Sequence, residues 1–352
     1  TYSTTNNGYF NLNGNNQTIK NGIFSRLSLQ NGGIKSFTDS TIVAFTGDAF
    51  RLRSGVTMKL NTNSAVVIAG NFDSESGAIL DNSGSVYFRG TNWRPNHDVL
   101  GNGWVNFTGG DQNVYGGKFT NVRFNNSSPA VNNWKTLYGN LIVNNDVVID
   151  NRYFTLQSYT INNSTTNGTF QVGMNVNGNV NFYVNGYDNF PSGFSEYQIH
   201  PLSITAYEST STQLIRGKTS DIDINYGTLR LRNSTKNLNG DIGILGSFNI
   251  DVSGVTFNSL GYTIQIAGNW NNNSSGGSTY NPGGSEVIFN GSVDQYINLT
   301  TASVNNFSKI RVNKQTSTNF VRATRELTVS DKLWVRKGQF ETTTTLYVGG
   351  DF

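Results

Sequence analysis

The chain has no cysteine among its 352 residues. Disulfides, zinc–thiolate sites and cysteine nucleophiles are therefore excluded together. Histidine is almost absent as well: only His97 and His200 occur, and no motif surrounds either of them. The sequence also lacks a Gly-x-Ser-x-Gly elbow, a phosphate-binding loop and a His-Glu-x-x-His helix. The usual sequence evidence for a hydrolase or a nucleotide-binding protein is thus missing.

Charge and long apolar runs are also scarce. Charged residues make up 13% of the chain and the formal net charge is +3, so no surface for binding nucleic acid is predicted. There is no apolar run of about 18 residues, so no membrane span is predicted. No Met or signal peptide precedes Thr1. We therefore expect the chain to be a mature product or a piece of a longer polypeptide.

Turn-forming and strand-forming residues are what the chain has in abundance. It contains 39 glycines and about 50 asparagines, together with many serines and threonines. This composition is typical of short strands joined by tight turns. Apolar and polar residues alternate over short stretches, as in 257–266 and 327–335, and helical spacing is nowhere sustained. An all-β fold is predicted.

One motif recurs along the chain. A Gln is followed two residues later by an apolar residue, and more than 50 residues downstream a Gly followed by Asn or Asp closes the segment. Such self-similarity indicates a tandem array. We expect four cassettes of roughly 80 to 100 residues, with the bounds 1–72, 73–180, 181–270 and 271–352. The four glutamines are Gln17, Gln112, Gln213 and Gln295.

Two architectures fit short strands at this spacing. One is a parallel β-solenoid (β-helix) with turns of about 20 to 25 residues, and the other is a series of tandem β-sandwich domains. Similar short strands recur within a cassette, no Pro-rich linker separates the cassettes, and Asn is abundant. Asn tolerates sharp left-handed corners, and its side chain can hydrogen-bond from one turn to the next. We therefore expect one continuous β-solenoid over residues 1–352, with tandem β-sandwiches as the alternative.

Three segments of the last cassette carry a resemblance to a known family. They are the strand Val287-Ile-Phe289-Asn-Gly291, the step Gln295-Tyr-Ile297 and the closing Val348-Gly-Gly350-Asp-Phe352. This succession resembles the repeat-bearing, adhesin-like cell-surface proteins of Bacteroidota that are exported by the type IX secretion system. The resemblance implies an extracellular location on the bacterial cell surface, with the secretion and outer-membrane anchoring machinery as partners. The C-terminal export domain of that family is not visible, so we expect a fragment of a larger protein.

Carboxylates give little indication of catalysis or metal binding. Asp221 and Asp223 would share one face of a strand, where they could hold a cation or act as acid and base. The favoured interpretation is a solvated outer face opposite Ile222 and Ile224. No catalytic residue, metal site or cofactor is therefore predicted. Calcium stays an alternative that no recurring ligand spacing supports.

Two segments, 90–104 and 184–203, exceed the period and are expected to emerge as insertions on one side of the solenoid. Both are rich in aromatic residues, which supply contact area for glycans or proteins at low entropic cost. The alternative is that these rings fold back over the flank of the solenoid. The candidate ligand-binding residues are Trp93, Arg94, Trp104, Tyr187, Phe190, Phe194 and Tyr197.

These features favour a non-enzymatic structural or adhesive segment of a large secreted surface protein, which projects from the cell or binds surface glycans or proteins. One alternative is a polysaccharide-acting β-helix lyase or hydrolase, which would need Asp, Glu, Lys and Arg gathered in one groove. Another is a self-assembling filament subunit, in which open strand edges stack end to end.

Overall fold

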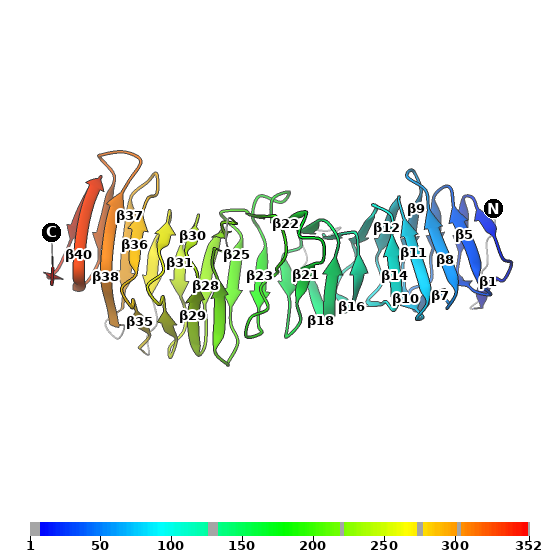
Figure 1. Ribbon diagram of the computed structural model, residues 1–352, viewed down its shortest axis with the longest axis horizontal. Helices are drawn as coiled ribbons and strands as arrows, with labels where there is room; N and C mark the ends of the chain where they lie inside the picture. The colour runs from blue at the N-terminus through cyan, green and yellow to red at the C-terminus, as the bar shows by residue number, and fades with distance from the viewer. Residues whose placement is uncertain (1–7, 126–132, 219–221, 273–276, 301–303, 351–352) are drawn as a thin grey trace. The chain divides into compact units, whose positions relative to one another are not determined.

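The described part of the chain is built from parallel β-strands. The computed structural model describes residues 8–125, 133–218, 222–272, 277–300 and 304–350. Every element in this part is a strand, and the strands stack in parallel as a β-solenoid of about 14 turns (Figure 1). This confirms the predicted solenoid. The β-sandwich alternative is wrong, because sandwiches are built from antiparallel strands.

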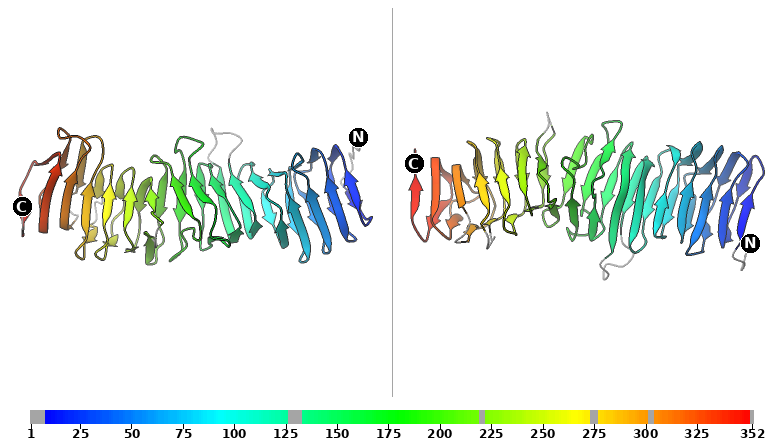
Figure 2. Two further views of the ribbon diagram at one scale, coloured as in Figure 1. Left: turned by 45° about the horizontal axis from the view of Figure 1, so that its top comes forward. Right: turned by 90° about the horizontal axis from the view of Figure 1, so that it is seen from below.

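The chain divides into two compact units, which are described separately. Unit 1 comprises Thr1–Gln171 with Pro191–Glu196, and unit 2 comprises Val172–Phe190 with Tyr197–Phe352. The boundary between Gln171 and Val172 falls within the second predicted cassette, and the segment Pro191–Glu196 falls within the third. Within each unit, the paired strands of successive turns lie side by side (Figure 2). No helix in the described ranges is long and apolar enough to cross a membrane.

Each turn of unit 1 supplies one strand to each of three faces. The first face contains β1 (Tyr9–Leu12), β4 (Arg26–Leu29), β7 (Asp48–Leu52), β10 (Asn71–Ser74), β13 (Asn92–Arg94), β16 (Gln112–Phe119), β18 (Trp134–Val143) and β20 (Tyr153–Thr155). The second contains β2 (Gln17–Ile19), β5 (Gly33–Phe37), β8 (Val56–Leu60), β11 (Ala78–Asn82) and β14 (His97–Leu100), and the C-terminal parts of β16 and β18 continue it toward β21 (Ile161–Asn163). The third contains β3 (Gly22–Phe24), β6 (Thr41–Val43), β9 (Ala65–Ile68), β12 (Ser85–Phe88), β15 (Trp104–Phe107), β17 (Asn121–Phe124) and β19 (Val147–Ile149).

Unit 2 also has three faces. The first contains β23 (Asn181–Val184), β25 (Ile204–Tyr207), β28 (Thr228–Leu231), β31 (Phe248–Ile250), β34 (Trp270–Asn272), β37 (Gln295–Leu299), β39 (Phe320–Ala323) and β41 (Gln339–Thr342). The second contains β26 (Gln213–Arg216), β29 (Thr235–Asn239), β32 (Thr256–Asn258), β35 (Thr279–Asn281) and the start of β38 (Val304–Asn313). The third contains β27 (Asn225–Tyr226), β30 (Ile242–Ile244), β33 (Ile264–Ile266), β36 (Glu286–Phe289), the rest of β38, β40 (Leu327–Lys337) and β42 (Leu346–Val348). Two further strands, β22 (Thr169–Val172) and β24 (Glu196–Ile199), cross the bounds of the units.

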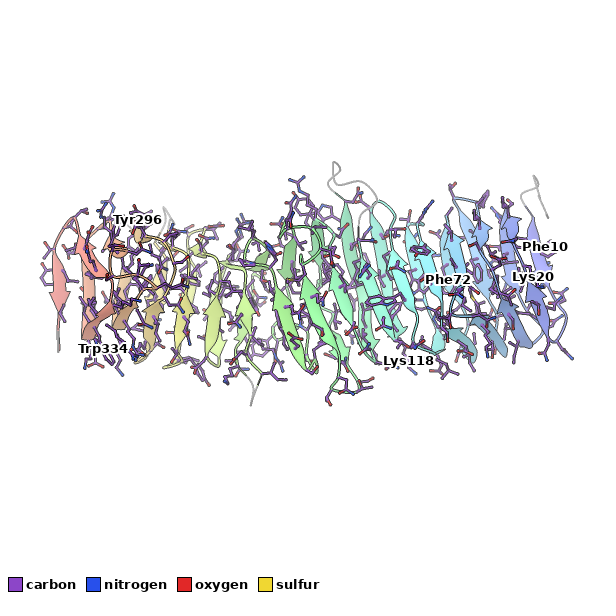
Figure 3. The ribbon with its side chains drawn as sticks, turned by 90° about the horizontal axis from the view of Figure 1, so that it is seen from above. Phe10, Lys20, Phe72, Lys118, Tyr296 and Trp334 are labelled. Carbon is purple, nitrogen blue, oxygen red and sulfur yellow. The ribbon has the colours of Figure 1, made fainter. Side chains whose placement is uncertain are left out.

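The core of each unit is a column of inward-pointing apolar side chains. In unit 1, Phe50, Phe72 and Trp93 lie in register on successive turns, 22 and 21 residues apart. Their ring centroids are 5.5 Å and 3.9 Å apart. Figure 3 shows Phe72 inside the ribbon and Lys118 on its outer side. Each buried ring contributes about 1.5 to 3 kcal/mol. Because ordering the backbone costs about 1 to 2 kcal/mol per residue, a turn is stable only when stacked on its neighbours.

Asn side chains bond from turn to turn on the outside of unit 2. Asn271 Nδ2 donates to Asn249 Oδ1 at 2.7 Å, and Asn298 Nδ2 donates to Asn271 Oδ1 at 2.8 Å. A second ladder of the same kind joins Asn237, Asn258 and Asn281. The prediction that stacked Asn side chains link the turns is confirmed.

The closing glycine of the motif occupies a crowded corner. A Cβ on Gly70 would lie 2.1 Å from the carbonyl oxygen of Gly47, and one on Gly90 would lie 2.0 Å from that of Gly70. In unit 2, a Cβ on Gly268 would lie 2.4 Å from the carbonyl oxygen of Gly246. Only glycine fits this corner, because each turn rests directly on the backbone of the turn before it.

Residues 90–104 form an ordinary turn, and the expectation of an insertion there is wrong. Strands β13, β14 and β15 cover this segment and pair in register with β10, β11 and β12 of the preceding turn. The additional residues in this cassette therefore form one more turn of the solenoid. This turn stays within the stack because its three strands pair with those of the preceding turn.

Candidate functional site

Four of the seven aromatic and basic candidates lie in the core. Trp93 has no exposed surface and stacks on Phe72. Phe190 packs against Tyr226 in unit 2, with ring centroids 5.5 Å apart, and Phe194 lies 5.6 Å from Phe170 in unit 1. The fourth buried residue is Tyr197. Expecting these rings to meet a ligand was wrong, since burying an aromatic ring stabilises a turn more than exposing it does.

The other three candidates are accessible but do not form one site. Tyr187, in unit 2, is 60% exposed. In unit 1, Arg94 is on the first face and Trp104 is on the third face, beneath the guanidinium of Arg123. Arg94 pairs with Asp73 at 3.4 Å.

Neither histidine is arranged for catalysis. His97 is buried, and its Nδ1 shares a hydrogen bond of 2.8 Å with the Ser74 hydroxyl. Burial lowers the pKa of His97 to about 4. His200 Nδ1 accepts the backbone N–H of Leu202 at 3.2 Å, which shapes a tight turn. Within the described ranges, no group of three His, Cys, Asp or Glu side chains could hold a metal ion.

Most charged side chains link the turns of the solenoid. Nine of the ten ion pairs found among the described residues join neighbouring turns, as in the bidentate pair between Arg311 and Glu286 at 2.9 Å and 2.8 Å. The tenth pair is local: Lys218 Nζ and Asp223 Oδ1 are 2.9 Å apart. Asp221, the other member of the sequence-derived carboxylate pair, lies outside the described residues.

Each motif glutamine is associated with a buried lysine of the next turn, a feature that our sequence reasoning missed. Lys135 pairs in register with Gln112, and its Nζ donates to the carbonyls of Gly109 and Gly110 at 2.6 Å and 2.7 Å. Burial lowers its pKa to about 7. The sequence feature that could have predicted these pairs is a Lys that follows each motif Gln by one turn and occupies an inward-pointing position. The other pairs are Gln17 with Lys35, Gln213 with Lys236 and Gln295 with Lys314.

These polar pairs lie at two different corners of the turn. Gln112 and Gln295 each begin a strand of the first face, whereas Gln17 and Gln213 begin strands of the second face. The pairs satisfy backbone carbonyls inside the solenoid, where an unpaired carbonyl would be costly. These contacts give the pairs a structural role.

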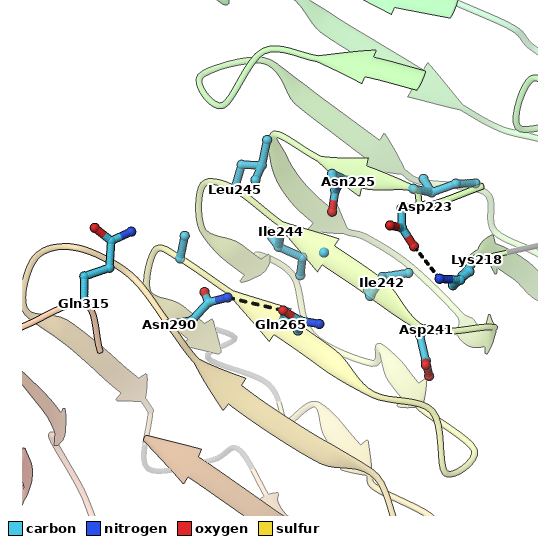
Figure 4. Close-up of a pocket in the computed structure, with 13 residues that line it drawn as sticks. Lys218, Asp223, Asn225, Asp241, Ile242, Ile244, Leu245, Gln265, Asn290 and Gln315 are labelled. Carbon is cyan, nitrogen blue, oxygen red and sulfur yellow. Dashed lines mark hydrogen bonds and ion pairs between the residues drawn. The ribbon is translucent and has the colours of Figure 1, made fainter. Parts of the chain in front are cut away.

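A polar groove lies on the outer side of the third face of unit 2, over β27, β30 and β33 (Figure 4). Its volume is about 420 Å³. Gly243 forms the middle of the floor, and its neighbours in register are Asn225 and Gln265. The carboxamide of Asn225 leans over the floor, since a Cβ on Gly243 would lie 1.9 Å from Asn225 Oδ1.

The rim of the groove combines amides with paired charges. The local ion pair of Lys218 and Asp223 lies at one end, and Asp241 Oδ1 accepts the backbone N–H of Thr263 at 2.7 Å. At the other end, Asn290 Nδ2 lies 3.4 Å from Gln265 Oε1. The groove is also lined by Gln315, Leu245 and Ala267 and by three isoleucines, Ile224, Ile242 and Ile244.

The groove offers many hydrogen-bonding groups and little net charge. Each side-chain amide presents a donor and an acceptor side by side, which matches neighbouring hydroxyl groups on a sugar ring. The ammonium of Lys218 is neutralised by the adjacent carboxylate. A site of this kind suits an uncharged polyhydroxylated ligand better than an ion or an apolar molecule.

Comparisons with known proteins found no matching family model, no matching curated protein and no matching solved structure. Function is therefore inferred from the geometry of the sites.

Proposed function

We propose that the protein is a non-enzymatic adhesive segment of a bacterial surface protein and that it binds a surface glycan in the groove of unit 2. The observation that carries the proposal is the set of side-chain amides around Gly243. Asn225 lies one turn before Gly243, Gln265 lies one turn after it, and Asn290 lies on the turn after that; all three line one cavity. The stack spaces neighbouring turns by about 4.8 Å and so holds these amides at fixed positions.

The disposition of charges supports binding rather than turnover. Catalytic carboxylates in polysaccharide-acting enzymes work as pairs with distinct protonation states, close to the scissile bond. In the groove, Asp223 is paired with Lys218, and Asp241 accepts a backbone N–H. Each of these carboxylates is thus already engaged by a partner within the fold, which supports binding rather than turnover.

The sequence supports the surface location. The resemblance to repeat-bearing surface proteins of Bacteroidota implies export, and a chain without cysteine does not depend on a particular redox compartment. Turn-to-turn ion pairs and Asn ladders would give such a segment the stiffness needed to present a ligand site. We propose no cofactor.

A glycan array followed by titration calorimetry tests this function. The wild-type chain should bind neutral oligosaccharides without releasing shorter products. Replacing two of the groove amides in an Asn225→Ala/Gln265→Ala variant should weaken binding about thirtyfold, because the two lost hydrogen bonds contribute about 1 kcal/mol each.

The matched control is Gln339→Ala, which removes an exposed amide from the first face of unit 2. It should bind like the wild type. Unchanged affinity in the double variant would exclude the groove as the site. Cleavage of a bound glycan would instead support the polysaccharide-acting enzyme.

A further inference from the structure

A second polar cavity, the trough, lies on unit 1 at the corner between its first and second faces. Its volume is about 360 Å³. Four successive turns pass this corner, at Gly77, Pro95, Gly117 and Asn140. It lies within one unit and is built only from described residues.

Glycines keep this corner open. Gly77 and Gly117 have φ angles of 80° and 124°, which side chains rarely tolerate. A Cβ on Gly117 would also lie 2.5 Å from Cγ of Pro95. The strand register shifts between Val114 and Tyr115, so the backbone of β16 bends as it crosses from the first face to the second. The conformation of the backbone at this corner therefore creates the trough.

An aromatic column stands immediately before the corner. Tyr115 and Tyr138 directly precede Gly116 and Gly139 on successive turns, and their rings stack with centroids 5.3 Å apart. They are 42% and 47% exposed. The guanidinium of Arg94 lies 5.7 Å from the Tyr115 ring and continues the column into the preceding turn.

Polar and aliphatic groups of the second face lie beyond the corner. Asp98 and Lys118, on neighbouring turns, form an ion pair. Ile142, which is in register with Lys118, is 41% exposed. Asn140 Oδ1 accepts the backbone N–H of Thr160 at 3.0 Å, which holds its carboxamide at the corner. The opposite charges of the pair cancel, so the lining favours an uncharged ligand.

We propose that this trough is a second glycan-binding site, in which a neutral sugar packs against the Tyr115–Tyr138 column and hydrogen-bonds to Asn96, Asn140 and the Asp98–Lys118 pair. Aromatic rings supply rigid apolar contact area for one side of the ligand. A few fixed polar groups orient the other side. Arg94, predicted from the sequence as a ligand-binding residue, belongs to the column.

The proposal rests on the proposed function for the class of ligand, but its residues belong to unit 1 alone. No tyrosine or tryptophan is among the residues that line either cavity, and at the trough the aromatic contact would come from the Tyr115–Tyr138 column that directly precedes the corner. The two sites should therefore prefer different neutral sugars, because the column at the trough offers a packing surface to an apolar sugar face.

An array of neutral and uronate-containing oligosaccharides, probed with the full chain, tests the trough. A Tyr115→Ala/Tyr138→Ala variant should lose about tenfold in affinity for a subset of the neutral sugars that the wild type binds. Tyr87→Ala is the matched control, because Tyr87 is a partly exposed tyrosine on the third face of the same unit. It should leave the whole pattern unchanged, and equal melting temperatures would show that each variant is folded.

The outcomes separate the two sites. If the groove variant Asn225→Ala/Gln265→Ala binds like the wild type while the tyrosine variant loses sugars, the groove proposal fails and the trough proposal stands. If the tyrosine variant keeps the full pattern or loses only uronate-containing sugars, the trough proposal is overturned. If the wild type binds no neutral sugar, both proposals fail.

Discussion

The side-chain amide of Gln112 donates a hydrogen bond of 2.9 Å to the carbonyl of Gly90 on the preceding turn. Its Nε2 also donates to the carbonyl of Phe88 at 3.0 Å. Gln295 repeats the arrangement in unit 2, where it donates to Ile266 at 3.0 Å and to the closing glycine Gly268. In these two copies the Gln of the motif therefore satisfies corner carbonyls that face the interior.

Replacing Gln112 with Met should destabilise the protein by about 2 to 3 kcal/mol. The side chains are similar in size, but two buried carbonyls lose their donor, and each unsatisfied group costs about 1 to 3 kcal/mol. Chemical denaturation followed by circular dichroism measures the effect. Gln315→Met, at an exposed position, should change the stability by less than about 0.5 kcal/mol. Equal stabilities for the two variants would contradict a structural role for the motif.

The buried amine of Lys135 should make stability depend on pH in the alkaline range. Burial lowers its pKa from 10.5 to about 7, so the folded state favours the neutral amine. The wild type should gain stability as the pH rises from 7 toward 10.5, on the order of 4 kcal/mol from this group. A Lys135→Met variant should lack this part of the slope. The exposed Lys118→Met should retain it, and identical slopes in wild type and Lys135→Met would refute the assignment.

His97 should make the protein sensitive to acid. Burial lowers its pKa from 6.5 to about 4, so protonation opposes folding. Its contribution is complete above pH 6.5 and is lost as the pH falls toward 4, a change on the order of 3 kcal/mol. In His97→Asn this loss should disappear, whereas His200→Asn should behave like the wild type. Thermal melts across pH 4 to 7 measure how the stability of each variant depends on pH. If His97→Asn had the same pH profile as the wild type, protonation of His97 would not be the cause of the acid sensitivity.

Substituting the corner glycine Gly90 by Ala should cost at least about 2 kcal/mol. The new Cβ would lie 2.0 Å from the carbonyl oxygen of Gly70, so neighbouring turns would have to separate. Gly110→Ala is the control, because the nearest atom to its Cβ is 3.9 Å away. Urea denaturation should give a lower midpoint for the first variant only. A wild-type midpoint for Gly90→Ala would mean that the corner adapts.

Much of the fold was predictable because its causes are local. Strands follow from short apolar alternation, corners from Gly and Asn, and the turn-to-turn ladders of Asn271 and its neighbours from the number of asparagines. The orientation of individual rings was not predictable. Side chains alternate in a strand, so a shift of one residue in register turns a ring from the surface to the core. Trp93 is buried for this reason, while Arg94 beside it is exposed.

The candidate sites were less accessible to sequence reasoning. The groove combines Asn225, Gln265 and Gln315 from different turns, and the trough combines Asp98, Lys118 and Ile142. These residues are about 20 residues or more apart along the chain, and no short motif marks them. Each set meets only because the turns that carry it stack in a particular register.

By itself, the sequence determined that this protein is a repetitive all-β structure and favoured a stacked parallel solenoid over tandem β-sandwiches, since alternation, turn residues and repetition act over a few residues at a time. Only the tertiary structure decided which aromatic side chains face solvent and which polar groups share a cavity. The physical reason is that these outcomes depend on the number of residues in each turn and on where the strand register shifts, and neighbouring turns set both together.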